Sequence, residues 1–191
     1  MALVKLNARS ATALDATILT GNLPAISGAS LTGISGGLTV ADQWRVNATF
    51  SNDALPITAN WERIDTTGQG TITGSQMSES SGIFTFPSTG IYLVKMIFGA
   101  RAYSGNAETQ YETHIQLTTN NSSYATVAEG HQCGSGSNSD LNATCESLID
   151  VTDVANVKVR IGVNCAASNS MTLAGSGKND NSVTFLRLGD T

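Results

Sequence analysis

The stretch that decides the fold is GIFTFPSTGIYLV, residues 82–94. Pro87 and Gly90 bracket a short turn in it, because proline pre-sets the backbone for a turn and glycine tolerates positive φ angles. Apolar and aromatic side chains on both sides of the turn predict two strands that share one core. Residues 91–98 are apolar on nearly every position, which predicts a central strand covered on both faces. The aromatic side chains of the quoted stretch are Phe84, Phe86 and Tyr92.

A period of two continues outside this stretch. In residues 108–117, polar side chains such as Glu112 and His114 alternate with a second set that includes Tyr111 and Ile115. Such alternation is typical of a strand with one buried face. The same pattern is found in residues 44–50 and 157–163, and further strands are expected at Ile83–Phe86, Tyr124–Glu129, Thr144–Val151 and Val183–Leu188.

Turn-forming residues separate the expected strands. Gly, Ser and Asn gather at residues 104–106, 120–123, 134–140 and 175–181, and no amphipathic helical pattern lies between them. Short strands at such regular spacing predict a β-sandwich or jelly roll. Charged residues make up only 13% of the chain, against about 25% in an average soluble protein. Ser, Thr, Asn and Gly replace them, which suits strands and turns better than long helices.

The quoted stretch resembles a signature of the globular heads of complement component one-q and their tumour-necrosis-factor-like relatives. That signature, Gly-x-Phe-x-x-Pro-x-x-Gly-x-Tyr, falls here on Gly82, Phe84, Pro87, Gly90 and Tyr92. Residues 183–188 resemble the family's terminal core strand, whose Phe lies near the trimer axis. The resemblance covers about residues 44–191. It implies an all-β, ten-stranded jelly-roll sandwich that assembles as a compact homotrimer, but it implies no single function.

Residues 1–43 form the first of two expected domains, and residues 44–191 form the second. The first domain has no aromatic residue, and its segment NLPAISG at 22–28 is followed eight residues later by SLTGISG. Pro24 and the glycines disfavour a helix. An extended, mostly non-helical arm is therefore expected, with a reach on the order of 140 Å. A floppy linker is the alternative, but the arm's apolar side chains would be costly to expose. The expected anchoring side chains are Leu19, Leu23, Ile26, Leu31 and Ile34.

Residues 11–28 resemble the opening of marine-phage fibre-like proteins, in which a similar arm precedes varied C-terminal domains. The resemblance implies a bacteriophage virion protein that is assembled in the host cytoplasm. Its arm would bind other virion proteins of the portal, tail or capsid. The N-terminus has no signal-peptide pattern, and no stretch approaches the about 20 apolar residues of a membrane span. We therefore expect neither secretion by the usual route nor membrane insertion.

Charge and cysteine content exclude further classes. The net charge is −5, the pI is about 4.8 and the ten Lys and Arg residues are scattered. Nucleic-acid binding is not expected, because it depends on a basic surface that releases counterions. Three cysteines are an odd number, which argues against a disulfide framework. Cys133 and Cys145 flank a Gly/Ser loop, so they either pair across a hairpin or stay reduced, and cytoplasmic assembly favours reduced thiols.

Patterns that resemble catalytic motifs lack their structural context. Residues 33–37 match G-x-S-x-G, but the Gly-rich repeat around them offers neither the strand nor the helix of a nucleophile elbow. Residues 175–179 lack the Ser/Thr of a phosphate loop. Glu108 and Glu112 share a strand face and are interpreted as solvated charges. The histidines, His114 and His131, are expected at the surface or an interface and complete no zinc spacing. We therefore expect no enzyme and no cofactor.

A metal near the trimer axis is a separate expectation, because some trimers of this superfamily bind calcium there. No ligand-loop spacing supports such a site in the sequence. The acidic side chains that would serve are those of Asp140, Glu146, Asp150 and Asp153.

Two functions fit the sequence best. The first is a trimeric surface fibre or short spike, whose knob binds a host-surface glycan or protein through uncharged polar loops. Its expected receptor-binding residues are Tyr103, Ser104, Asn106, Tyr124, Ser135 and Asn138. The second is a capsid decoration or cement protein, whose arm lies on the head shell and stabilises it. A depolymerase is a distant third, because no carboxylate constellation supports it.

Overall fold

The computed structural model describes residues 38–70, 73–102, 110–134, 139–165, 170–172, 174 and 178–191. Every regular element in these ranges is a β-strand, as the all-β prediction requires. Within the same ranges, no helix is long and apolar enough to cross a membrane. Residues 1–37 of the expected arm, which include its anchoring side chains from Leu19 to Ile34, lie outside the described residues.

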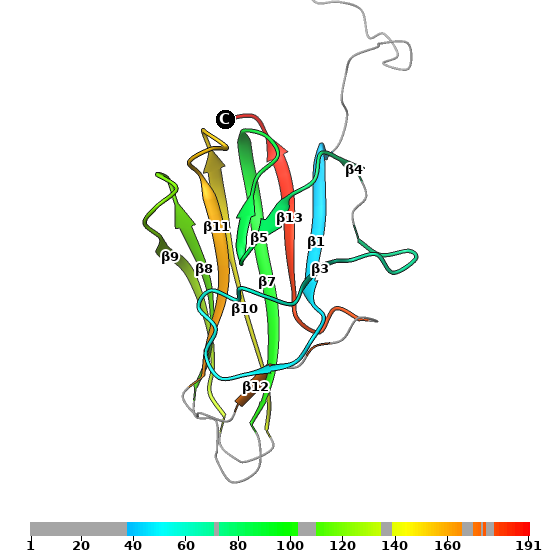
Figure 1. Cartoon of the computed structure of the whole chain (residues 1–191), viewed down its shortest axis with the longest axis vertical. Coiled ribbons are helices and arrows are strands. Elements are labelled where there is room, and N and C mark those ends of the chain that lie inside the picture. The colour runs from blue at the N-terminus through cyan, green and yellow to red at the C-terminus, as the bar shows by residue number, and fades with distance from the viewer. Residues whose placement is uncertain are drawn as a thin grey trace, which may run out of the picture. The chain divides into compact units, whose positions relative to one another are not determined.

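The strands form two antiparallel layers (Figure 1). The first layer is an eight-stranded sheet made of β1 (Val40–Val46), β2 (Phe50–Ser51), β3 (Trp61–Arg63), β4 (Thr73–Gly74), β7 (Gly90–Ala102), β10 (Asp140–Val151), β12 (Ser170–Thr172) and β13 (Ser182–Gly189). The second is a five-stranded sheet in the order β5 (Ser78–Ser80), β6 (Ile83–Thr85), β11 (Lys158–Cys165), β8 (Tyr111–Thr118) and β9 (Ala125–Gln132).

Pairing between distant strands makes this sandwich a jelly roll. β1 pairs with the last strand, β13, and β13 pairs with β7, which also pairs with β10. The order β3, β1, β13, β7, β10 faces the five strands of the second sheet, so ten strands form the body of the sandwich. The short strands β2, β4 and β12 extend the first sheet. The fold class predicted from the sequence is confirmed.

The predicted signature lies at the centre of the core. Phe84 is fully buried, and its ring lies between those of Trp61 and Phe185, at centroid distances of 5.0 and 5.1 Å. Gly82 has a φ of +83°, and a Cβ there would lie 2.4 Å from the carbonyl oxygen of Ile57, so only glycine fits. Phe185 packs inside the sandwich. That Phe185 lies near a trimer axis, as the resemblance implies, stays a prediction.

The strand boundaries differ from expectation mainly at the start of the domain. β1 begins at Val40, so the jelly roll includes residues that the sequence pattern assigned to the arm. The strand ends at Val46, and Ala48 is exposed instead of continuing the buried face. The backbone N–H of Asn47 still donates to the carbonyl oxygen of Asn60, but the strand does not continue beyond this contact. The alternation predicted through residue 50 is thus wrong beyond Val46.

β7 is central in its sheet but is covered on one face only. Tyr92, Val94, Met96 and Phe98 point into the core and are fully buried. On the opposite face, Leu93 stands between Leu186 of β13 and Leu148 of β10 in the strand register. Leu148 is 64% exposed and Ile97 is 38% exposed. We call the set Leu93, Ile97, Leu148, Leu186 and Leu188 the apolar face. The second face, which the sequence pattern predicts to be covered, is thus partly exposed in the described residues of the single chain.

Candidate functional site

The outer surface of the five-stranded sheet carries a polar row along β8. Because side chains alternate along a strand, Glu112, His114 and Gln116 point outward while Tyr111, Thr113 and Ile115 fill the core. β9 and β11 flank β8 on its two sides and add polar side chains to the same surface. We call this surface the polar face.

Two histidines and two glutamates lie together on the polar face, and each histidine is close to both glutamates. The register sets Glu112 opposite His131 and His114 opposite Glu129. His114 Nε2 lies 3.3 Å from a Glu112 oxygen, and His114 Nδ1 lies 3.3 Å from a Glu129 oxygen. His131 Nδ1 and Nε2 lie 3.4 and 3.7 Å from the same two carboxylates. Both imidazoles therefore stand between the two carboxylates, and we call these four residues the His/Glu quartet.

His114 is buried although it belongs to the polar row. Its side chain is only 5% exposed, and neither ring nitrogen makes a hydrogen bond. On the neighbouring strand β11, Gly162 stands opposite His114. A Cβ at Gly162 would lie 2.2 Å from the Leu55 side chain, so Leu55 occupies the space that glycine leaves on this strand. The sequence prediction of a surface position holds for the half-exposed His131 but is wrong for His114.

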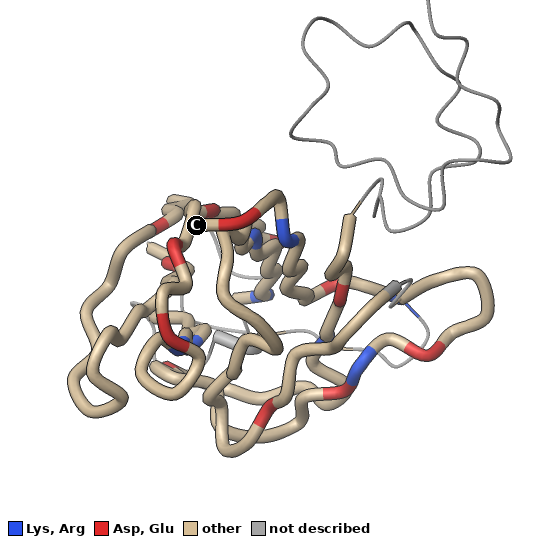
Figure 2. The backbone as a smooth tube through the Cα atoms, turned by 90° about the horizontal axis from the view of Figure 1, so that it is seen from above, with Lys and Arg blue, Asp and Glu red and all other residues tan. Residues whose placement is uncertain are grey.

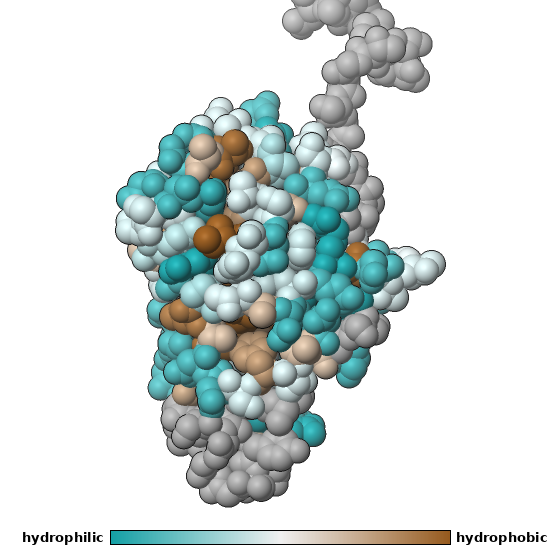
Figure 3. All heavy atoms as spheres, in the orientation of Figure 1, coloured by the Kyte–Doolittle hydropathy of each residue, from teal (hydrophilic) through white to brown (hydrophobic). Residues whose placement is uncertain are grey.

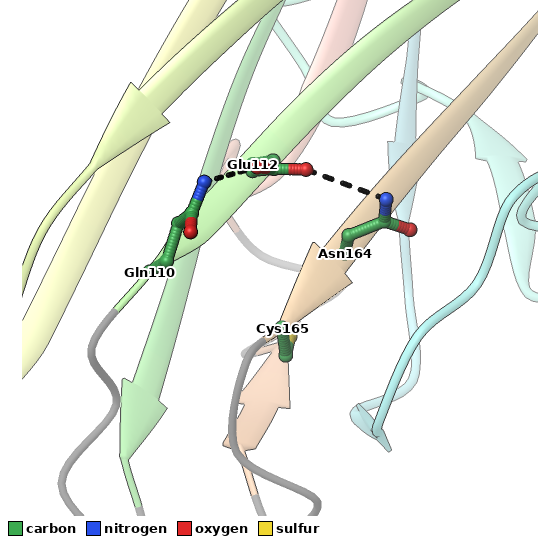
Figure 4. A pocket seen from close by; sticks show the side chains of 4 residues that line it. All are labelled: Gln110, Glu112, Asn164 and Cys165. Atoms are coloured by element: carbon green, nitrogen blue, oxygen red, sulfur yellow. Dashed lines mark hydrogen bonds between the residues drawn. The ribbon is translucent and has the colours of Figure 1, made fainter.

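A shallow pocket of about 190 Å³ adjoins the quartet at the end of β8. Gln110, Glu112, Asn164 and Cys165 line it, and Figure 4 shows their side chains around Glu112. Gln110 and Asn164 donate their amide N–H groups to the two Glu112 oxygens. The carboxylate is thus held between two amides at the pocket wall. Its partners are these amides and the two histidines. Glu108, the partner considered from the sequence, lies outside the described residues.

Tyr124 belongs to the other end of the polar face. The guanidinium of Arg160 lies 3.7 Å above the centre of its ring, a cation–π contact, and also donates to Gln116. Burial raises the pKa of Tyr124 above its ordinary value, although the nearby Arg160 charge lowers it in part. A second pocket, of about 310 Å³, is lined by Leu117, Thr119, Ser123, Tyr124, Ala125 and Val127.

The remaining candidates from the sequence are not brought together in the described residues. Tyr103, Ser104, Asn106, Ser135 and Asn138 lie outside them, so Tyr124 is the one expected receptor-binding residue with a described position. Cys133 is exposed and Cys145 is buried, and both are free thiols. Burial raises the pKa of the Cys145 thiol, which keeps it in the unreactive thiol form.

Three of the four acidic residues considered for calcium have other partners, the exception being Asp150, for which no side-chain partner lies among the described residues. Asp140 pairs with Arg101, whose hydrogen bond lowers the pKa of the Asp140 carboxyl, and Glu146 pairs with Lys95. Asp153 accepts hydrogen bonds from Ala155 and Asn156 in its own turn. Among the described residues, no three potential metal ligands already converge on one point. Figure 2 shows acidic and basic positions interspersed along the described backbone, without a continuous basic stripe.

The quartet is the part of the site that sequence reasoning missed. Each histidine is separated by one residue from a glutamate, in the segments 112–114 and 129–131. That spacing signals two mixed pairs on strand faces, but it does not reveal that the two strands are neighbours. The pairing of β8 with β9 in this register brings the pairs together.

Solved structures with the same fold are tumour-necrosis-factor family proteins. The Eiger TNF of S. frugiperda aligns with a TM-score of 0.57 and 14% identity, covering 81% of this chain and 96% of the other. Murine APRIL at pH 5.0 aligns with a TM-score of 0.54 and 10% identity, covering 78% and 98%. At such low identity the likeness shows the fold alone. No known family model matches the sequence, and no curated protein does either.

Proposed function

We propose that this chain is a non-enzymatic structural protein of a bacteriophage virion, a homotrimeric surface fibre or short spike whose knob binds a receptor on the host. The apolar face is the observation that carries the assembly part of this proposal. Leu148 and Leu188 are more than half exposed, and Leu93 and Leu186 connect them across three adjacent strands. Continuous exposed apolar surface of this kind marks an interaction site.

Copies of the same chain are the partner that best fits the apolar face. The resemblance to tumour-necrosis-factor-like heads implies a compact trimer, and the described fold is that of this family. A Lys95–Glu146 ion pair, 3.4 Å long, lies between Leu93 and Ile97 on the same face. Interfaces between subunits commonly combine apolar surface with such polar pairs.

The polar face supports the binding part of the proposal. Carboxylates and amides on one sheet surface are groups that hydrogen-bond sugar hydroxyls, as a host glycan would require. This surface contains two pockets, one beside Glu112 and one beside Tyr124. Figure 3 shows one side of the molecule, where apolar side chains interrupt a largely polar surface. Three weak sites on one knob would gain affinity through avidity.

The virion part of the proposal rests on the N-terminal sequence. The repeat in residues 22–36 offers pairs of apolar side chains that need a partner to bury them, and residues 11–28 resemble a phage-fibre arm. The same arm supports the alternative, a capsid decoration protein, because Leu19, Leu23 and Ile26 would be buried equally well against capsid subunits. The arm favours both functions, whereas the modular order of arm and adhesin-like head favours the fibre.

Deletion of residues 1–36 is expected to leave a soluble trimer that binds intact host cells but no longer joins virions, because β1 begins only at Val40. The labelled protein would be titrated onto host cells, with unrelated bacteria as the control. Saturable, host-specific binding supports the fibre. Absence of binding by a folded trimer would refute it and favour the capsid surface. Loss of the trimer would assign assembly to the arm instead of the apolar face.

A further inference from the structure

We propose that Glu112, His114 and His131 bind one divalent transition-metal ion, for which Zn²⁺ fits best, and that Glu129 orients both imidazoles from outside the coordination sphere. The site lies on the polar face of β8 and β9. It is independent of the virion function proposed above, because it follows from the chemistry of the His/Glu quartet alone.

The backbone register places the donors where a metal site needs them. Glu112 and His114 are two residues apart on one strand, and His131 is directly opposite Glu112 on the next. Their side chains therefore leave the sheet on the same side as near neighbours. Two histidines and one glutamate are an established ligand set for zinc that keeps one coordination position open.

His114 is the feature that points to a ligand. Its imidazole is 5% exposed, and both of its nitrogens lack a hydrogen-bond partner while they face the two carboxylates. Buried polar groups without partners are rare, and each calls for an explanation such as an ion. A zinc ion bound to Nε2 would satisfy one nitrogen of His114. Its Nδ1–H would then donate to Glu129, 3.3 Å away.

The distances agree with this arrangement. Zinc–nitrogen and zinc–oxygen bonds of about 2.0–2.2 Å place two ligand atoms of a tetrahedron about 3.4 Å apart. His114 Nε2 and His131 Nδ1 lie 3.3 and 3.4 Å from the Glu112 oxygens. Both imidazoles now lie next to the Glu112 carboxylate. A rotation of the His131 side chain is therefore needed to bring the donor atoms of Glu112, His114 and His131 to one ion. That side chain is 49% exposed and has room to turn.

The net charge of the His/Glu quartet also favours a bound divalent metal ion. With neutral histidines, the quartet carries two negative charges from Glu112 and Glu129, and a divalent cation balances both. Glu129 faces His114 Nδ1 and His131 Nε2, the nitrogens turned away from Glu112. A carboxylate in that position fixes the tautomer of a ligating histidine.

Calorimetric titration of the full-length, metal-stripped protein with Zn²⁺ and with Co²⁺ tests the site. We expect one ion per chain, with a Co²⁺ absorption spectrum typical of tetrahedral nitrogen and oxygen ligands. His131→Asn and Glu112→Gln are expected to abolish this binding. Glu129→Gln is expected to weaken it about 10–100-fold, as loss of an outer-shell partner does. His131 is half exposed, so its replacement leaves the fold intact even if His114 variants do not fold.

Two controls separate this site from other sources of metal binding. Glu79→Gln, on β5 of the same sheet, is expected to bind like the parent chain, because its amide oxygen still accepts the Gly82 N–H. A Cys133→Ser/Cys165→Ser double variant is expected to retain the ion, since neither thiol belongs to the ligand set. The proposal is overturned if the parent chain binds no ion in a one-to-one ratio. It is equally overturned if His131→Asn binds like the parent, or if the double cysteine variant loses the ion.

Discussion

Replacement of Phe84 by alanine is expected to lower the free energy of unfolding by about 3–5 kcal/mol, the usual cost of removing a large aromatic side chain from a core. Phe84 is fully buried, and a cavity at its position would lie between the two sheets. Its ring packs against those of Trp44, Trp61 and Phe185, at centroid distances of 5.6, 5.0 and 5.1 Å. Such aromatic pairs add stability beyond the area that they bury.

Urea denaturation at a fixed protein concentration measures this loss, because assembly makes stability depend on concentration. Phe50→Ala is the matched control. Phe50 lies in the short strand β2, is half-buried and packs at the edge of the core, so a smaller loss is expected. A change below about 1 kcal/mol for Phe84→Ala would contradict the central position of the signature strand.

Leu148→Glu is expected to dissociate the proposed trimer while leaving the monomer folded. The side chain is 64% exposed in the single chain, so a charge there meets water and costs the monomer little. In the trimer, each copy would bury an unpaired carboxylate, which costs about 3–5 kcal/mol. That penalty corresponds to an association at least about a hundredfold weaker. Analytical ultracentrifugation over a range of concentrations reports the change in oligomeric state.

Val127→Glu is the matched control for this assembly test. Val127 is 42% exposed, but it lies on β9 of the other sheet, away from the apolar face. The same substitution there is expected to leave the oligomeric state unchanged. A Leu148→Glu chain that associates as tightly as the parent would show that the apolar face is not the contact between subunits. Dissociation of both variants would mean that added charge alone, at any position, weakens the assembly.

Much of the fold is predictable from local sequence patterns. The alternation in residues 108–117 identifies β8 and assigns Tyr111 and Ile115 to the core, as the structure confirms. The signature around Pro87 and Gly90 identifies the turn between β6 and β7. These features are local because the direction of a side chain along a strand depends only on its position in the two-residue repeat. Turns likewise depend on the φ angles that proline and glycine allow.

The burial of Arg45 is a feature that local sequence patterns do not predict. Its neighbours Trp44 and Val46 are core residues, and the alternation places Arg45 on the solvent side, yet it is 1% exposed. β3 supplies Glu62, which stands opposite Arg45 in the register, and the segment after β3 supplies Asp65, as ion-pair partners at 2.7 and 3.2 Å. No period in residues 44–50 contains that information, because these partners come from another part of the chain. His114 is likewise buried at 4% exposure although the alternation along β8 places it on the outer side.

The sequence by itself determined the strands, the turn signature and the residues of one core face, all of which depend on contacts within a few residues. Only the tertiary structure decided which strands are neighbours. It set Glu112 beside His131 and left one face of β7 uncovered. Strand pairing depends on hydrogen bonds between segments far apart in the chain, and many registers satisfy the same local pattern. The core selects one of them, and that selection created the His/Glu quartet and the apolar face.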